Sequence, residues 1–304
     1  MGITKVAENK WCSKRTWQYT NSAREAWSSI IEEYKKENPF SKILLPAYIG
    51  WSANEGSGIF DSVKNANVDF EFYTLDQHLN IDLEDLKYKA NNNEKCLVLL
   101  VHYFGFIDKK YVEITEWLNQ ENIYYIEDCA HAWLTDLIGG KCGRNGKKAF
   151  YSLHKMLPLP SGGLLVSNGV QEEDIDSINP FISLNYDLLN IYNRRRKNYQ
   201  YLVKKLYNIK NIEILHNELE EGICPQTLPV LLNDVNRDEV YHKMNALNFG
   251  MVSLYHTMIK ELNHYNAESC SITYKKIINF PIHQDVTNID LDDLVRNLKL
   301  ILNV

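Results

Sequence analysis

Two short segments of the sequence contain residues that could perform chemistry, and the first ends in a pair of acids. The apolar residues Tyr125 and Ile126 are typical of a buried β-strand, and they lead directly into Glu127 and Asp128. In a parallel sheet this places Asp128 at the carboxyl end of its strand, where open α/β sheets bind ligands. Aspartate also caps turns and helices. From this segment alone, ligand binding and capping are equally well supported.

The second segment contains a lysine in apolar surroundings. Lys155 follows a strand candidate at residues 150–152 and precedes a stretch rich in proline and glycine, residues 158–163. Burial in such a segment lowers the pKa of a lysine and favours the neutral, nucleophilic amine. Ser152 could hydrogen-bond an anion while the lysine attacks a carbon. A surface lysine with a snorkelling stem is the commonest alternative, but the nearby acidic segment favours a reactive lysine.

At these segments the sequence resembles the DegT/DnrJ/EryC1/StrS family of aminotransferases, which depend on pyridoxal 5′-phosphate (PLP). In that family a strand ends in Glu-Asp-Ala-Ala-Gln/His, a second strand carries a serine and the Schiff-base lysine, and Gly-Gly opens a third. This chain has the same order, and stretches that resemble family motifs continue from about Thr20 to the C-terminus. The matching stretches are residues 80–82, 101–105, 127–131, Ser152, Lys155, 162–168 and 279–283.

The resemblance implies a PLP site with four residues in defined roles. Lys155 would be catalytic and hold the cofactor as a Schiff base, and Asp128 would keep the pyridine nitrogen protonated. Trp51 occupies the position of the family's stacking aromatic, for which an indole offers a broad apolar face. His131 lies where the family has a Gln or His near the cofactor's phenolic oxygen. An ordinary core tryptophan and a satisfied core histidine are the alternatives for the last two residues.

The cofactor's phosphate is expected at the N-terminus of the first helix, where free N–H groups attract anions. Ser22, Ala23 and Arg24 stand in place of the family's Ser-Gly-Thr, so the backbone donors remain and Arg24 could add charge. The resemblance also implies a role for Asn185, whose family counterpart reaches the phosphate of the neighbouring subunit. The arginine usual after that motif is Asp187 here. We therefore expect a homodimer with composite sites, in line with the general preference for two-fold closure.

These residues require a scaffold of alternating strands and helices. Short apolar runs alternate with amphipathic stretches up to about Gly169, which is typical of βαβ units and a mainly parallel sheet. The expected fold is a three-layer αβα domain of PLP-dependent transferase fold type I, residues 1–185, followed by a smaller C-terminal α+β domain, residues 186–304. Strands are predicted at 43–45, 70–73, 96–102, 123–127, 150–152, 163–167, 227–232, 251–254 and 277–280, and helices from about 23 to 34 and at 111–119, 188–207, 237–248 and 289–301.

Composition limits the other functions open to the chain. The protein has 304 residues and a formal net charge of −6, which gives no overall attraction to nucleic acid or anionic membranes. No apolar run reaches the roughly 18 residues of a membrane span. Six scattered cysteines without a CxxC pair are typical of free, buried thiols, so we expect a cytoplasmic protein. Cys129, His131 and Cys142 fit no standard zinc spacing, so no metal is expected. The basic residues 194–197 are interpreted as a solvated helix face.

The expected reaction is the transfer of an amino group from glutamate to a keto sugar carried on a nucleotide, in amino-sugar biosynthesis. The sugar part of this expectation rests on the resemblance alone. Family members that act as sugar dehydratases carry histidine in place of the Schiff-base lysine, so Lys155 favours transamination. Two alternatives stay open, because the chain is shorter than expected for the family: a non-catalytic homologue that binds a sugar nucleotide, and an enzyme acting on another small acceptor.

Overall fold

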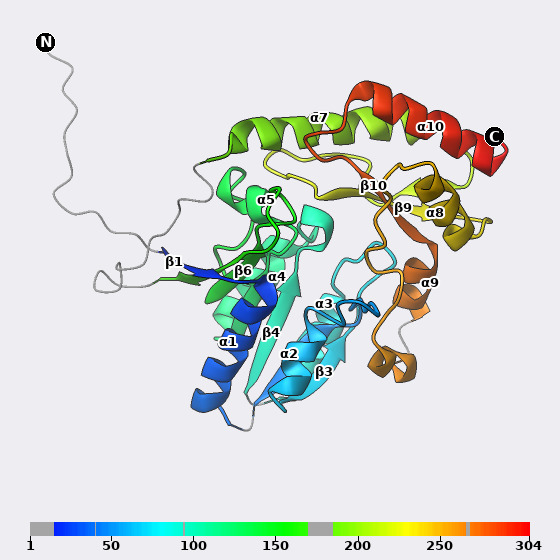
Figure 1. Ribbon diagram of the computed structural model, residues 1–304. Coiled ribbons are helices and arrows are strands. Elements are labelled where there is room, and N and C mark those ends of the chain that lie inside the picture. Colours follow the sequence, from blue (N-terminus) through cyan, green and yellow to red (C-terminus); the bar gives the residue numbers. More distant parts are fainter. Residues whose placement is uncertain (1–14, 40, 94, 170–184, 266–267) are drawn as a thin grey trace, which may run out of the picture.

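The computed structural model describes residues 15–39, 41–93, 95–169, 185–265 and 268–304. Figure 1 shows a large sheet with helices packed around it and a smaller sheet that lies beneath two long helices. The two sheets divide the chain in sequence order, since the large one uses strands up to residue 168 and the small one begins at residue 212.

The larger sheet has seven strands in the order β1-β7-β6-β5-β4-β2-β3. Strands β3, β2, β4, β5 and β6 pair in parallel, whereas β7 pairs antiparallel with both β6 and β1. The mainly parallel sheet that the sequence predicts is therefore confirmed. Its strands are β1 (Arg15–Thr20), β2 (Lys42–Pro46), β3 (Asp69–Tyr73), β4 (Cys96–Val101), β5 (Tyr124–Asp128), β6 (Lys148–Ser152) and β7 (Gly163–Asn168).

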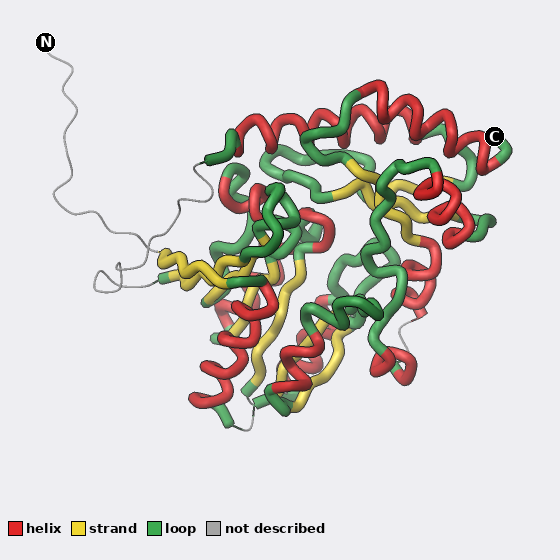
Figure 2. Tube along the Cα trace, viewed as in Figure 1, coloured by secondary structure: helices red, strands yellow, loops and turns green. Residues whose placement is uncertain are grey.

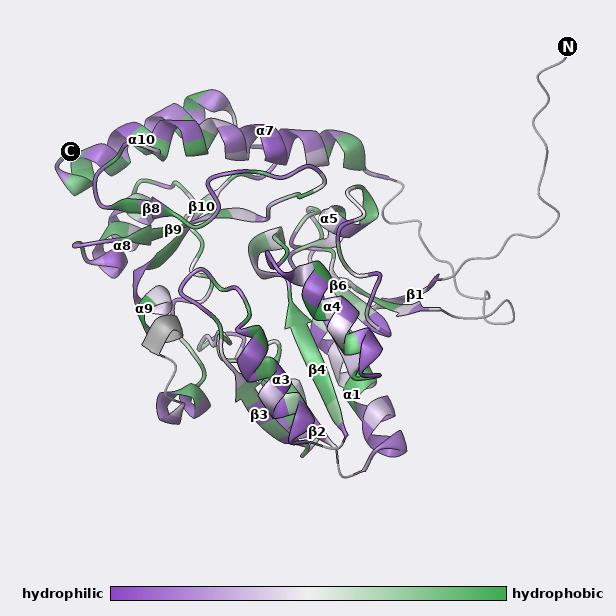
Figure 3. Ribbon diagram, turned by 180° about the vertical axis from the view of Figure 1, so that it is seen from behind, coloured by the Kyte–Doolittle hydropathy of each residue, from purple (hydrophilic) through white to green (hydrophobic). Residues whose placement is uncertain are grey.

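Helices cover both faces of this sheet. Helix α1 packs against α2 and against β6 and β7, and Figure 3 shows α3 and α4 on the opposite face. Ala26, Trp27, Ile30, Ile31 and Tyr34 form the buried stripe of α1, at the spacing of an amphipathic helix. The helices around the large sheet are α1 (Ala23–Glu37), α2 (Phe60–Asn65), α3 (Leu83–Asn91), α4 (Tyr111–Gln120), α5 (Trp133–Leu137) and the short η1 (Tyr103–Gly105).

The C-terminal part forms a smaller α+β layer. Its three antiparallel strands follow the order β10-β9-β8, and in Figure 2 they lie as yellow tubes below two long red helices, α7 and α10. The elements are α7 (Leu188–Leu206), β8 (Ile212–Ile214), β9 (Thr227–Leu232), α8 (Arg237–Ala246), η3 (Lys260–His264), α9 (Glu268–Lys276), β10 (Ile277–Pro281) and α10 (Asn288–Leu302). The predicted α+β character is confirmed, while the boundary between residues 185 and 186 stays a prediction.

The basic stretch on α7 is only partly a solvated face. Arg194 and Lys197 are exposed as predicted, but Arg195 is 3% exposed and donates to Gln226 O at 3.0 Å. The interpretation was wrong for Arg195 because the helix turns this position inward, where the backbone carbonyl of Gln226 and the side-chain oxygen of Gln284 accept from the guanidinium.

Two other local features differ from what the sequence predicted. Strand β1 was not predicted, although Trp17 and Tyr19 alternate with polar residues in it, and it pairs with β7 at the edge of the large sheet. The predicted strand at residues 251–254 is wrong, because only Val252 forms an isolated bridge there, with Asn279. Across the residues described above, no helix has both the length and the apolar character needed to cross a membrane.

Candidate active site

A cavity of about 450 Å³ lies at the carboxyl ends of the parallel strands. It is lined by the N-terminus of α1, by the chain after β2 from Ile49 to Ile59, by residues at the ends of β4, β5 and β6, and by the C-terminal segment from Val252 to Tyr255. Asp128 and Lys155 both line it, so the structure brings together the two residues on which the sequence argument rests.

Asp128 is the last residue of β5 and pairs in register with Val101 and Phe150 on either side. Its Oδ1 accepts a hydrogen bond from the Ala130 N–H at 2.9 Å. Burial raises the pKa of Asp128 to about 6, although this hydrogen bond and the charge of Lys155 favour the ionised form. A carboxylate with this environment gains from a cationic partner in the cavity.

Lys155 follows β6 by three residues, at a turn in which the N–H of Leu153 donates to Gly162 O. Burial lowers the pKa of Lys155, and the negative charges of Asp128 and Glu55 only partly oppose this effect. A lowered pKa increases the share of the neutral amine, which is the form that attacks carbon and accepts protons.

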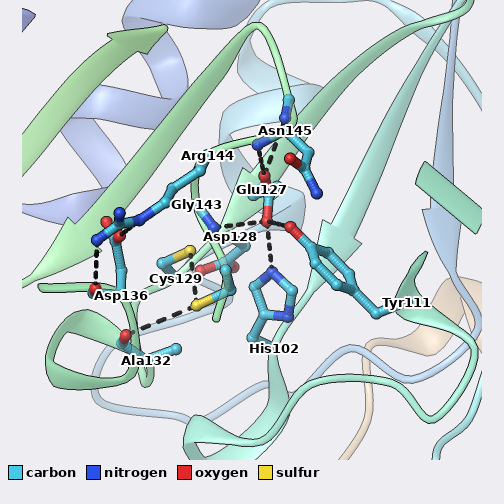
Figure 4. Close-up of polar contacts among 12 residues, drawn as sticks. His102, Tyr111, Glu127, Asp128, Cys129, Ala132, Asp136, Gly143, Arg144 and Asn145 are labelled. Carbon is cyan, nitrogen blue, oxygen red and sulfur yellow. Dashed lines mark hydrogen bonds and ion pairs between the residues drawn. The ribbon is translucent and has the colours of Figure 1, made fainter. Parts of the chain in front are cut away.

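Glu127, one residue before Asp128 on β5, is a buried anchor that holds the end of this strand through a network of hydrogen bonds. The carboxylate is completely buried and accepts five hydrogen bonds (Figure 4). Burial alone would raise the pKa of Glu127, but the hydrogen bond and charge of His102 and the neighbouring N–H donors lower it to about 2. The five donors are His102 Nε2 at 2.9 Å, Tyr111 Oη at 2.7 Å, and the backbone N–H groups of Gly143 at 2.7 Å, Asn145 at 3.0 Å and Gly146 at 2.9 Å. The sequence analysis missed this anchor.

His131 lines the cavity as a neutral donor. Its Nδ1 accepts a hydrogen bond from the Phe104 N–H at 3.1 Å, so the ring proton lies on Nε2. Burial and the charge of Lys155 hold the pKa of His131 well below its usual range. A neutral imidazole with a free Nε2–H can donate to an oxygen of a bound ligand.

The N-terminus of α1 supplies backbone donors to the cavity. Ser22 is the N-cap and accepts from the Glu25 N–H at 3.1 Å, while Ala23 and Arg24 line the cavity. Gly163 packs directly below, where a Cβ atom would lie 2.6 Å from the nitrogen of Ala23. Only glycine therefore lets β7 approach the helix start this closely, which is the arrangement of an anion site.

Of the remaining predicted site residues, Trp51 lines the cavity, whereas Ser152 and Asn185 do not. Trp51 lines the cavity and is 46% exposed, so the alternative of an ordinary core tryptophan is wrong. Ser152 is buried, and its hydroxyl contacts Nδ1 of His154 at 3.2 Å rather than the cavity. Asn185 is exposed and does not line this cavity. Asp187 caps α7 by accepting from the Asn190 N–H at 2.9 Å, which gives a local reason for the departure from the family arginine.

A buried thiol pair lies beside Asp128. Cys129 and Cys142 are fully buried, with sulfur atoms 3.9 Å apart, and a ring nitrogen of His102 lies within 4.8 Å of both. The structure thus brings His102 to the thiols, where the sequence analysis had considered His131. Burial raises the pKa of both thiols, and His102 Nε2 already contacts Glu127. Cys96 and Cys224 are also free and buried, as predicted, while Cys12 lies outside the described residues.

The sequence analysis did not identify the C-terminal residues of the cavity. Ser253 and Tyr255 line it, and so does Glu55 from the loop after β2. No spacing signal marks these positions, because they come from irregular backbone that is brought to the site only by the fold.

Comparison with known proteins agrees with this architecture. Residues 62–178 match the DegT/DnrJ/EryC1/StrS aminotransferase family. Over 95 residues the chain is 33% identical to the GDP-perosamine synthase of Vibrio cholerae, a match that covers 30% of this chain and 25% of that protein. The chain therefore aligns with only a quarter of this relative's length.

Solved structures show the same fold over nearly the whole chain. Helicobacter pylori PseC, an aminotransferase involved in the biosynthesis of pseudoaminic acid, gives a TM-score of 0.74 at 14% identity, covering 94% of this chain and 86% of its own. The Escherichia coli GDP-4-keto-6-deoxy-D-mannose-3-dehydratase with bound hydrated PLP gives 0.74 at 18% identity, covering 93% and 87%. At these identities the likeness establishes the fold.

Proposed function

We propose that the chain is an aminotransferase of the DegT/DnrJ/EryC1/StrS family, whose model matches residues 62–178, and that it binds PLP in the cavity between Lys155 and Asp128. The observation that carries the proposal is that a lysine with a lowered pKa and a buried carboxylate line one cavity together with a helix N-terminus. PLP requires these three features: an amine, a carboxylate and an anion site.

The residues present fit the cofactor. Lys155 would hold it covalently, and Asp128 would face its ring nitrogen, since Ala130 is the only described residue that donates to this carboxylate. Trp51 offers an apolar face to the ring. The backbone donors of Ala23 and Arg24 would receive the phosphate, and the close packing of Gly163 under this helix start supports that assignment.

Two predicted cofactor contacts have weaker support. Ser22 uses its hydroxyl as the N-cap, so its contribution would come from the backbone. Ser152 Oγ contacts the His154 ring, and a His154 N–H that donates to Oγ would leave the hydroxyl proton available for the phosphate. We retain both as proposals, together with His131, whose Nε2–H would donate to the phenolic oxygen of the cofactor.

When bound, PLP supplies an electron sink for the carbon that loses a proton. With the cofactor bound, Lys155 Nζ would accept a proton from the amine-bearing carbon of the substrate and deliver it to the C4′ carbon of the cofactor. Asp128 would stabilise the protonated form of the ring nitrogen through its negative charge. His131 Nε2 donates a hydrogen bond without adding charge to the site.

The proposed substrates are glutamate as amino donor and a nucleotide-linked keto sugar as acceptor, in amino-sugar biosynthesis. The names of the two aminating relatives, a GDP-perosamine synthase and an enzyme of pseudoaminic acid biosynthesis, support this substrate class. Since the dehydratases of the family replace the lysine with histidine, Lys155 supports amino transfer rather than dehydration.

The proposed active unit is a cytoplasmic homodimer. Asn185 is exposed and lies outside its own subunit's cavity, which fits a residue that reaches the partner's phosphate. The four described cysteines that are free and buried support a reducing compartment.

Two successive additions to the PLP-loaded protein test this function. L-Glutamate should first convert the cofactor to its amino form, seen as a loss of the visible absorbance band. GDP-4-keto-6-deoxy-D-mannose should then restore the band by accepting the amino group. A protein that never responds to glutamate, yet binds the sugar nucleotide tightly, would be a non-catalytic homologue. Conversion by glutamate without any response to keto-sugar nucleotides would retain the aminotransferase and discard the sugar.

A further inference from the structure

Tyr255 has a backbone conformation that an aromatic residue rarely adopts. Its φ is +59°, in the left-handed region that favours glycine, asparagine and aspartate. Such strain persists only where the surrounding structure enforces it, and it is concentrated at functional sites. Contacts that enforce this conformation would therefore mark Tyr255 as a functional position.

Backbone pairing fixes the segment that carries Tyr255. The Val252 N–H donates to Asn279 O at 3.1 Å, and Nδ2 of the buried Asn279 donates to Leu254 O at 3.2 Å. On the other side of the tyrosine, the Trp51 N–H donates to Thr257 O at 2.9 Å. Strand β10 and the loop that carries the stacking tryptophan thus hold both flanks of Tyr255.

Aromatic packing then fixes the ring. Tyr255 stacks on Tyr48 with ring centroids 5.1 Å apart and meets Tyr103, Phe104 and His131 edge-on at 5.3, 5.5 and 6.0 Å. Edge-to-face pairs of this kind are stabilising beyond their buried area. Gly50 makes room for the ring, since a Cβ there would lie 3.1 Å from Tyr255 Cδ1.

The hydroxyl group of Tyr255 takes no part in the backbone pairing or the aromatic packing described above. The residue lines the cavity with Asp128 and Lys155, and no other described residue forms a hydrogen bond with its hydroxyl. The ring is partly exposed, and the hydroxyl is not among the buried polar atoms that lack a partner. It therefore faces the open cavity.

The electrostatic surroundings keep this hydroxyl protonated. Burial raises the pKa of Tyr255, and the negative charge of Asp128 raises it further. The phenol is accordingly held in its neutral form, in which its O–H can donate, and none of the described residues accepts from it.

We infer that Tyr255 is the hydrogen-bond donor by which the C-terminal part of the chain contacts the reactants, donating to an oxygen that carries or develops negative charge. That oxygen belongs either to the ring of the cofactor or to the carbonyl of the acceptor. The inference rests on the proposed function, because it takes the cavity to be the reactant site. Trp51 and Tyr255, held by one backbone pairing, then contact the bound molecules together.

Binding measurements on Tyr255→Phe test the inference, because phenylalanine keeps the ring packing and removes only the hydroxyl. The first arm measures the Kd of PLP by titrating the absorbance band. The second measures the Kd of GDP-4-keto-6-deoxy-D-mannose for the PLP-loaded protein by calorimetry. Loss of the hydrogen bond should weaken PLP binding by more than about tenfold if the acceptor is the negatively charged ring oxygen of the cofactor. It should weaken sugar binding by about three- to tenfold if the acceptor is the neutral carbonyl oxygen of the substrate. Tyr103→Phe is the matched control: its hydroxyl donates to Tyr48 O at 2.6 Å, away from the cavity, and both constants should stay within about twofold.

The arms separate the possible outcomes. Weaker PLP binding identifies the cofactor's oxygen as the acceptor, and weaker sugar binding with unchanged PLP affinity identifies the substrate's oxygen. If Tyr255→Phe matches the wild type in both arms, the inference is overturned while the proposed function stands. If the wild-type protein binds neither PLP nor the sugar nucleotide, the proposed function and this inference both fail.

Discussion

Replacing Glu127 with glutamine should strongly destabilise the folded protein. Both oxygens of Glu127 are occupied as acceptors, Oε2 by three donors and Oε1 by two. Glutamine would turn one oxygen into an amide NH₂ group and place it against N–H donors. Buried networks broken in this way are costly, because polar groups lose partners that water cannot replace.

The depressed pKa gives the size of the effect. The pKa of Glu127 falls from 4.5 to about 2 on folding, which corresponds to about 3 kcal/mol of stability at neutral pH. Because the folded-state pKa is lowered, this contribution is complete above the unfolded pKa and is lost as pH falls toward 2. The gap between wild type and Glu127→Gln should therefore shrink by about 2 kcal/mol from pH 7 to pH 3.

Urea unfolding followed by circular dichroism at the two pH values is a suitable assay. Glu239→Gln serves as control, since Glu239 is exposed and its carboxylate forms a surface ion pair with Lys243 at 2.6 Å. This change should alter stability by less than about 0.5 kcal/mol at either pH. A Glu127→Gln protein as stable as the wild type, or a gap that does not change with pH, would refute the anchoring role.

Three further predictions concern the cofactor site. Asp128→Asn should still bind PLP, but glutamate should convert the cofactor more slowly by orders of magnitude, because the charge matters mainly in the transition state; near-normal conversion in stopped-flow absorbance would contradict this. Gly163→Ala should cost about 1–3 kcal/mol through the clash with Ala23 and weaken PLP binding; an unchanged unfolding midpoint would argue against close packing at the helix start. Sedimentation should show a homodimer. Asn185→Ala should weaken PLP binding while the protein remains a dimer, and a fully active monomer would exclude composite sites.

The positions of Asp128 and Lys155 at one edge of the sheet could be predicted from the sequence because the rules involved are local. A buried apolar run that ends in Asp128 and another that precedes Lys155 imply two parallel strands, and parallel strands end at one edge of the sheet. Order and polarity therefore indicated that both residues lie at this edge, and the family resemblance added the expectation that the carboxylate and the amine share one site.

Residues that depend on irregular backbone could not be predicted in this way. Glu127 is satisfied by N–H groups of the loop 143–146, whose path no periodicity reveals. The segment 251–254 has the apolar character of a strand, but pairing with Asn279 and the positive φ of Tyr255 turn it into the cavity wall. In both cases tertiary contacts override the local pattern.

The central claim is that Lys155 holds PLP, and reductive trapping tests it most directly. Borohydride treatment of the PLP-loaded protein, followed by peptide mapping, should place the pyridoxyl group on Lys155 alone. Lys155→Ala should lose both the visible absorbance band and the label, whereas a surface control such as Lys243→Ala should keep both. A label on another lysine, or a band that survives in Lys155→Ala, would contradict the account.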